Sequence, residues 1–237
     1  MKEVQSPTSK VRHAMTQRWE NLLFAHWRVD PASLTGKIPA GLSLDVRDGG
    51  AWIAVTPFVI SKLRLAGLPP IPGTSRFPEV NVRTYVTGAG GPGVWFFSLD
   101  AGSPLAVFFA RRLYHLPYFA ARIAVVEKDG GISYRCDRGP GDGAELLADY
   151  GPIGDPFRAV PGSIEEWLTG RYRLYATERG TLYRAEIAHE PWTLQRARAE
   201  IHRNTMAEAS GIELPPERPV LHFSRALDVE IGWPEKA

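Results

Sequence analysis

Apolar and polar residues alternate most clearly from Phe77 to Val86, a pattern of period two that predicts a β-strand. One face of this strand carries valine and threonine side chains, namely Val80, Val82, Thr84 and Val86. The opposite face carries an acid, an amide, a guanidinium and a phenol, namely Glu79, Asn81, Arg83 and Tyr85. Such a row is typical either of an exposed strand with a ladder of ion pairs or of the wall of a polar pocket. Our working hypothesis is the pocket wall.

The same alternation predicts strands along most of the chain. They are expected over residues 17–29, 42–46, 51–60, 94–99, 118–127, 132–138, 171–177, 181–189 and 219–231. Turn residues predict three hairpins: 42–46 with 51–60, 77–86 with 94–99, and 118–127 with 132–138. Residues 192–202 fit either another strand or the start of a helix, and 151–162 are expected to be largely irregular. The odd-numbered residues from Leu221 to Ile231 are expected on one strand face.

Helix signals are few. Ser103-Pro104 predicts a helix start, with serine as the N-cap and proline in the first turn, and this helix ends before Pro117. Ser163 and Glu166 form a capping box for a short helix through Leu168. Shorter helical segments are expected at 31–36 and 204–210, and the proline-rich residues 68–73 predict a loop that covers another feature.

About ten strands with few helices, and no alternation of strand and helix, predict an antiparallel-dominated β or α+β domain. We expect a single domain over residues 16–237 after a poorly ordered lead-in over residues 1–15. No internal repeat or linker interrupts it.

Composition narrows the class of protein. The 237 residues are 44% hydrophobic and 23% charged, which is normal for a globular protein with a sizeable core. The 28 basic and 26 acidic residues are mixed along the chain, so no nucleic-acid surface is expected. One cysteine, Cys136, excludes an intrachain disulfide and a cysteine-built zinc site. No apolar run could span a bilayer and no signal peptide is evident, so we expect a cytoplasmic protein without a membrane partner.

Six separated motifs resemble the YqjF-like family, which has no assigned biochemical function. They are residues 19–27, 77–86, 93–100 (GVWFFSLD), 110–118 (ARRLYHLPY), 168–175 (LTGRYRLY) and 189–192 (HEPW). The resemblance extends from about Thr16 to Trp233. The family is grouped with the acetoacetate decarboxylase-like superfamily, so the resemblance implies a cone-like, antiparallel-dominated β-barrel that encloses a polar cavity.

The resemblance also implies a departure from the superfamily's chemistry. Its named enzyme forms a Schiff base through one of two adjacent lysines that follow a proline. In the similar stretch here, Tyr118 and Phe119 stand after Pro117 in place of the lysines, and Arg112 stands in place of a glutamate. None of these can form an imine. Of the six lysines in the chain, only Lys62 has apolar neighbours, so we expect no Schiff-base decarboxylase.

The candidate ligand-binding residues follow from both lines of reasoning. They are Glu79, Asn81, Arg83, Tyr85, Arg112, His115 and Tyr118, with Glu79 and Tyr118 as the candidate catalytic pair. Glu79 suits acid–base work and an arginine suits a carboxylate. Arg111 and His115 are equally well explained by their place near a helix C-terminus. Arg171 and Arg173 share a strand face that could hold an anion or only mark a sheet edge.

Other chemistries have weaker signals. His26, His115 and His189 with Glu79 lack the spacing of a metal-ligand motif, so we expect no metal and no cofactor. There is no G-x-S-x-G elbow, and Cys136 fits a packed thiol better than a nucleophile.

Three functions remain open. The favoured one is a protein that binds a small anionic or carbonyl-containing molecule in the barrel pocket. The alternatives are a lyase or isomerase without an imine that uses Glu79 and Tyr118, and an oligomeric structural or interaction module.

Overall fold

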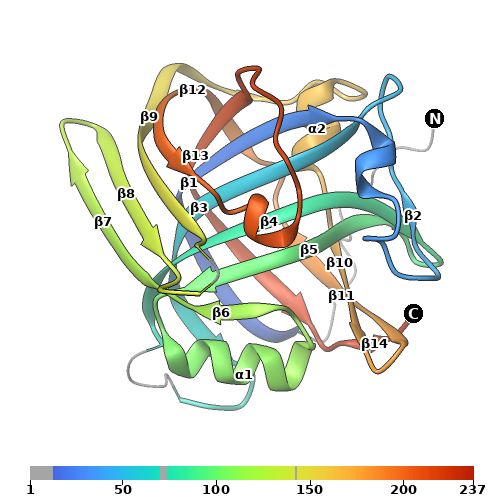
Figure 1. Cartoon of the computed structure of the whole chain (residues 1–237). Coiled ribbons are helices and arrows are strands. Elements are labelled where there is room, and N and C mark those ends of the chain that lie inside the picture. Colours follow the sequence, from blue (N-terminus) through green and yellow to red (C-terminus); the bar gives the residue numbers. More distant parts are fainter. Residues whose placement is uncertain (1–12, 70–73, 142) are drawn as a thin grey trace.

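The computed structural model describes residues 13–69, 74–141 and 143–237 (Figure 1). The strands are β1 (His13–Val29), β2 (Ser43–Leu44), β3 (Ala51–Leu65), β4 (Arg76–Gly88), β5 (Gly91–Ala101), β6 (Tyr118–Ala120), β7 (Arg122–Lys128), β8 (Gly131–Asp137), β9 (Glu145–Arg158), β10 (Arg173–Glu178), β11 (Thr181–His189), β12 (Thr193–Asn204), β13 (Val220–Gly232) and β14 (Glu235–Lys236). The helices are α1 (Pro104–Tyr114) and α2 (Ile164–Thr169), with short 3₁₀ turns η1 (Pro31–Leu34) and η2 (Glu208–Ser210).

Seven strands form a closed ring of hydrogen bonds. The ring runs β1, β3, β4, β5, β10, β11 and β13, and it closes because β13 pairs with both β11 and β1. Every pairing in the ring is antiparallel except β5 with β10. The predicted β-barrel is therefore confirmed. Closure leaves each strand of the ring with one face toward the barrel interior.

The remaining strands extend the sheet beyond the barrel. The early part of β13 pairs with β12, and β9, β8 and β7 follow in order. These strands curve over the outer faces of β1, β3 and β4, as Figure 1 shows on the side of the β7–β8 hairpin. A second hydrophobic core fills the space between them and includes Val55, Val82, Tyr134, Tyr150 and Phe223. The barrel wall thus has a core on each side.

Helix α1 lies across one end of the barrel and α2 near the opposite end (Figure 1). Ser103 caps α1 by accepting a hydrogen bond from the Ala106 amide, and His115 ends the helix in the left-handed conformation, with φ 55°. The Tyr114 hydroxyl donates to the Gly232 carbonyl at 3.1 Å, which fixes the C-terminal end of α1 to β13. No helix in the described ranges is long and apolar enough to cross a membrane.

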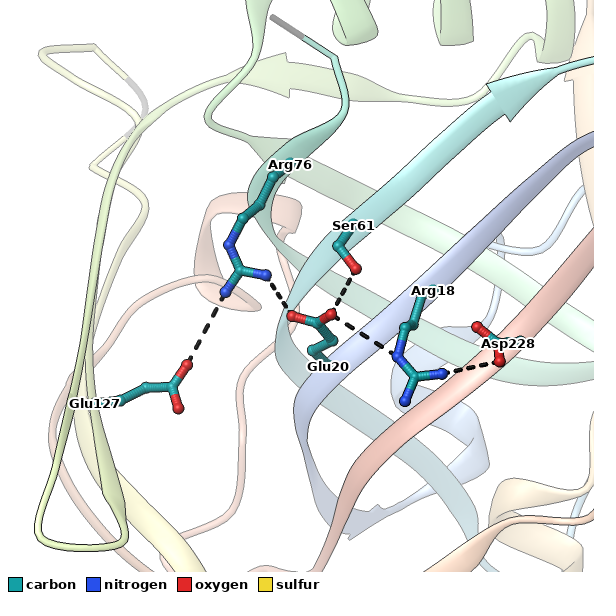
Figure 2. A network of polar contacts seen from close by, with 6 residues as sticks. All are labelled: Arg18, Glu20, Ser61, Arg76, Glu127 and Asp228. Atoms are coloured by element: carbon teal, nitrogen blue, oxygen red, sulfur yellow. Dashed lines mark hydrogen bonds and ion pairs between the residues drawn. The ribbon is translucent and has the colours of Figure 1, made fainter. Parts of the chain in front are cut away.

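A charged network lies on the outer face of the barrel (Figure 2). Glu20 on β1 accepts hydrogen bonds from Ser61 on β3 and from Arg76 on β4. Arg18 donates to Asp228 on β13 at 2.8 Å, and Arg76 also reaches Glu127 on β7 at 4.0 Å. Each charge in this network faces an opposite charge. The network joins four strands of the ring and contacts the hairpin outside it.

Several predicted boundaries are confirmed and others are wrong. The β4–β5 and β7–β8 hairpins form, both capped helices begin at the predicted residues, and 192–202 belongs to a strand. The hairpin of 42–46 with 51–60 does not form, because β1 and β4 occupy both edges of β3 and the short β2 pairs with the end of β4. The predicted strand 118–127 is divided: β6 pairs in parallel with β5, and only β7 pairs with β8.

Two further expectations fail because of tertiary contacts. Residues 151–162 are irregular only in part, because β12 supplies hydrogen bonds to β9 as far as Arg158. The odd-numbered residues of β13 do not share one environment: Phe223 packs in the outer core, whereas Leu227 and Val229 pack inside the barrel. Asn21 on the neighbouring β1 has φ 53°, and the inward-facing parity of β1 changes there as well.

The first strand begins at His13, four residues earlier than predicted. Residues 1–12 of the expected lead-in and residues 70–73 of the expected covering loop lie outside the described residues.

Candidate functional site

The barrel encloses a cavity of about 120 Å³. It lies between the inner faces of the ring strands and the inward face of α1. Its wall is mainly apolar, with Trp19, Leu22, Phe58, Phe96, Leu99, Phe109, Leu113, Leu174, Ile187 and Trp192 among the lining residues. Ten residues with polar or charged groups complete the wall: Gln17, Thr74, Glu79, Asn81, Arg83, Tyr114, Tyr118, Thr169, Arg171 and His189.

The polar row of β4 faces this cavity. Glu79, Asn81 and Arg83 line it, and the alternating valines face the outer core instead. Tyr85, the fourth member of the row, is fully buried and does not line the cavity; its hydroxyl lies 2.6 Å from Nε2 of His26. The register of β4 between β3 and β5 fixes this orientation, because a slip of one residue would reverse both faces.

Glu79 and Tyr118 are in direct contact. The Tyr118 hydroxyl donates to Oε2 of Glu79 at 2.8 Å. Burial raises the pKa of Glu79 to about 8, with a smaller contribution from Asp100, although hydrogen bonds from Tyr118 and Asn81 oppose the rise. Burial and the neighbouring Glu79 also raise the pKa of Tyr118 well above its ordinary value. At neutral pH the pair is therefore largely protonated and carries little charge.

Arg83 brings a cation into the cavity wall. Its guanidinium lies over the Phe24 ring, 5.5 Å from the centroid, and its buried Nε has no hydrogen-bond partner. Among the described residues, no carboxylate forms an ion pair with Arg83. The Arg83 side chain as a whole is only partly buried, but a buried N–H group without a partner is costly, so Nε is a site for a hydrogen-bond acceptor.

Arg171 lies near Arg83 at the same part of the wall. Its Nη1 donates to Asp45 at 2.6 Å and its Nε donates to the Trp167 carbonyl, but the buried Nη2 has no partner. Burial lowers the pKa of Arg171, and the charge of Arg83 lowers it further, while Asp45 opposes both. The structure thus places two guanidinium groups, one of them paired with a carboxylate, at the end of the cavity away from α1.

Two uncharged histidines, His26 and His189, lie near this cationic end. Burial lowers the pKa of His26 well below its ordinary value, and Arg83 and His222 lower it further. Burial also lowers the pKa of His189, although backbone carbonyls at Glu190 and Arg171 oppose that shift. Both rings are therefore neutral near pH 7. They leave the positive charge of the site to the two arginines.

The other sequence-predicted residues lie elsewhere. Arg112 is exposed on α1, and His115 contacts Glu178 at 3.3 Å and the Tyr183 ring, outside the cavity wall. Their positions follow from the helix: Ala106, Phe109, Ala110 and Leu113 form its inward face. Arg173 pairs with Glu186 at 2.6 Å, so it does not act with Arg171 on an anion.

Sequence reasoning missed Gln17, Thr169 and Trp192 and gave Arg171 only an ambiguous role. Arg171 and its partner Asp45 are 126 residues apart, so no local spacing connects them. The N-cap and helix signals around α2 were the available clue, because Thr169 ends that helix and Arg171 follows the C-cap residue Gly170.

The positions of Lys62, Tyr118 and Phe119 bear on the prediction that the chain is no Schiff-base decarboxylase. Lys62 is exposed on the outside of β3, and no lysine of the described residues lines the cavity. Tyr118 lies on the cavity side of β6. Phe119 lies on the opposite side, where the Arg138 guanidinium stacks over the Phe119 ring, 3.9 Å from the ring centroid.

Within the described ranges, no group of three or more His, Cys, Asp or Glu side chains is arranged to hold a metal ion. Cys136 is buried in the outer core.

Arg138 and Asp100 form a buried ion pair behind the Glu79–Tyr118 contact. Two guanidinium nitrogens of Arg138 donate to the two oxygens of Asp100 at 2.6 and 2.8 Å. Asp100 and Phe119 are neighbours across the β5–β6 pairing, so Arg138 contacts both strands at once. This clamp helps to hold β6 where Tyr118 reaches Glu79.

Comparison with known proteins agrees with this fold. Residues 16–228 match the model of the DUF2071 family, described as "Uncharacterized conserved protein". The chain belongs to this family. It is 48% identical over 220 residues to the "Uncharacterized protein YqjF" of Bacillus subtilis (strain 168), a match that covers 93% of this chain and 90% of that protein. The resemblance drawn from the six motifs is thereby confirmed.

Solved structures share the DUF2071 chain's fold at low sequence identity. The enduracididine biosynthesis enzyme MppR, complexed with pyruvate, is similar with a TM-score of 0.66 and 12% identity, over 97% of this chain and 93% of that one. Acetoacetate decarboxylase from Legionella pneumophila is similar with a TM-score of 0.64 and 12% identity, over 99% and 93%. These likenesses confirm the acetoacetate decarboxylase-like fold.

Proposed function

We propose that the barrel cavity binds a small organic anion whose carboxylate lies against Arg83 and Arg171. The observation that carries this proposal is the pair of buried guanidinium atoms, Arg83 Nε and Arg171 Nη2, that have no hydrogen-bond partner. A carboxylate accepts two parallel hydrogen bonds from such groups and compensates their charge. The neutral state of Glu79 supports the proposal, because an ionised Glu79 in the same cavity would repel the ligand.

Arg83→Met is the decisive variant. With butanoate as the probe in isothermal titration calorimetry, we expect binding to the unaltered protein and a loss of tenfold or more in affinity in the variant, since one charged hydrogen bond is worth about 1.5–3 kcal/mol. Arg112→Met is the matched control, because it removes an exposed arginine outside the wall. Equal affinities in all three proteins, or no binding in any, would contradict the proposal. Mass spectrometry of molecules that co-purify then identifies the natural ligand.

One contact favours a second candidate, an enzyme that transfers protons without an imine. Glu79 has a pKa near neutrality and touches Tyr118, an arrangement suited to removing a proton next to a carbonyl group. In such a step the C–H bond breaks, the proton moves to the Glu79 carboxylate, and the electron pair moves to the carbonyl oxygen, which accepts a hydrogen bond from Tyr118. No lysine of the described residues stands on the wall to form an imine.

The exchange of substrate protons for deuterium tests this candidate. With 2-oxohexanoate in D₂O, we expect the C3 proton signals to disappear faster as pH rises through about 8, because only the ionised Glu79 is a base. Glu79→Gln should abolish the enzyme-dependent exchange and Tyr118→Phe should slow it. Exchange at the same rate in Glu79→Gln would rule out this role.

A further inference from the structure

The anion proposed above meets a wall that is charged at one end only. The two arginines lie at the end away from α1, whereas the wall between them and α1 is mainly aromatic and aliphatic, with Glu79, Asn81 and Tyr118 as uncharged polar groups near neutral pH. Trp19 stacks on Trp192 at 5.9 Å and meets Phe58, which is paired with Glu79 across β3 and β4, edge to face at 5.7 Å. A ligand that filled only the cationic end would leave this apolar surface uncovered.

The direction of β4 orders the polar groups along the cavity. Glu79 lies near the beginning of β4, and Arg83 follows four residues later, roughly 13 Å farther along a strand. Ala106, Phe109, Ala110 and Leu113 of α1 close the cavity at the Glu79 end. Leu113 is 36% exposed, so this apolar end is also where the wall meets solvent.

We infer that the ligand is a hydrophobic monocarboxylate, bound with its carboxylate at Arg83 and Arg171 and its hydrocarbon tail toward α1. This inference rests on the proposed function and narrows its ligand class. The reverse orientation would place the carboxylate against Glu79 and the tail against two guanidinium groups. A dicarboxylate would bring a second charge to a part of the wall that has no cation, and a sugar acid would bury more hydroxyl groups than the few polar residues of that wall can bond.

The cavity volume sets the size of the tail. An apolar cavity of about 150 Å³ holds one benzene molecule, and the cavity here measures about 120 Å³. The enclosed cavity therefore holds the carboxylate with about three or four carbon atoms, and a tail of about five carbon atoms reaches the α1 end beside Leu113, where the wall meets solvent. Longer tails must displace α1 side chains.

A series of straight-chain acids tests the inference by calorimetry: acetate, butanoate, hexanoate, octanoate and decanoate, with hexan-1-ol as the uncharged analogue of hexanoate. Each added methylene should tighten binding about fourfold up to hexanoate, since burying one is worth about 0.8 kcal/mol. The gain should stop or reverse by decanoate. Hexan-1-ol should bind at least tenfold more weakly than hexanoate, because it lacks the charge that faces the arginines.

Two variants of α1 locate the tail. Ala110→Phe fills the end of the cavity, so it should weaken hexanoate at least tenfold and leave butanoate within about twofold. Phe108→Ala is the control, because Phe108 is 62% exposed on the outer side of the same helix. It should leave the whole series unchanged. If Ala110→Phe fails to fold, as judged by circular dichroism, Ala106→Val provides the smaller obstruction at the same end.

The outcomes separate the two proposals. If acetate and hexanoate bind equally and both lose affinity in Arg83→Met, the anion site stands and the hydrophobic tail is wrong. If hexan-1-ol binds as tightly as hexanoate, the apolar wall acts without the arginines and both proposals fail. If Ala110→Phe weakens butanoate and hexanoate equally, the tail does not point toward α1 and the proposed orientation is overturned.

Discussion

Two polar regions of the barrel wall differ in how their charges are satisfied. On the outer face, Glu20 has two hydrogen-bond donors and the arginines beside it face carboxylates (Figure 2). On the inner face, Glu79 is buried with the phenol of Tyr118, and Arg83 and Arg171 retain buried nitrogen atoms without partners. The charges of the outer region are satisfied within the protein, whereas the inner region retains the unpaired donors on which we base the proposed ligand site.

The two glutamates show what this difference does to acidity. Burial alone would raise the pKa of Glu20, but hydrogen bonds from Ser61 and Arg76 and the charges of Arg76 and Arg18 outweigh it and lower the pKa. For Glu79 the hydrogen bonds from Tyr118 and Asn81 do not outweigh burial, and its pKa is raised to about 8. The same side chain on opposite faces of one barrel therefore shifts in opposite directions. The difference is that arginines act directly on Glu20, whereas no cation lowers the pKa of Glu79.

The largest expected effect comes from breaking a satisfied pair where water cannot replace the lost partner. Asp100→Ala leaves the Arg138 guanidinium, which is 6% exposed, without its carboxylate. We expect the free energy of unfolding to fall by about 3–5 kcal/mol in urea denaturation. The double variant Asp100→Leu with Arg138→Met should recover most of the loss, because no charge is left buried. A loss below about 1 kcal/mol in the single variant would show that water reaches Arg138.

The next effect is a change in pH dependence. Glu79 has a folded-state pKa above its unfolded value of about 4.5, so folding binds a proton between these values and stability falls as pH rises from about 4.5 to about 8. Glu79→Gln removes this dependence. The difference in unfolding free energy between variant and parent should change by up to about 1.4 kcal/mol per pH unit in that window. If the difference in unfolding free energy does not change with pH, the pKa of Glu79 is the same in the folded and unfolded states and the prediction is wrong.

The smallest effect concerns the outer network. The pKa of Glu20 is lowered, so its contribution to stability is present above its unfolded pKa and is lost as pH falls through the lower folded value. Glu20→Gln should reduce the unfolding free energy at pH 7 by less than about 1 kcal/mol, since exposed ion pairs contribute little. Salt at 1 M should remove most of that difference. A cost above 2 kcal/mol would mean that the outer charges are as poorly hydrated as the inner ones.

Local signals predicted the elements whose geometry depends on neighbouring residues. Ser103-Pro104 and the Ser163 capping box started helices as expected, because a cap needs only a side chain and the next turn. The alternation from Phe77 to Val86 separated the two faces of β4 correctly. The prediction that Arg112 and His115 line the pocket was wrong. Which face of α1 points into the barrel depends on how the helix packs against the strands, and this is not encoded in the spacing of its own residues.

The sequence by itself determined the family resemblance, the β-rich class, the mixed polar row of β4 and the absence of a lysine after Pro117. Which face of that row points inward, and what stands opposite it, were decided only when the ring of strands closed. Closure brings Arg171, with its partner Asp45, near Arg83 from distant parts of the chain and leaves Glu79 buried against Tyr118. Burial and partner choice are properties of that closed wall, and they set both the charge of the site and its unpaired donors.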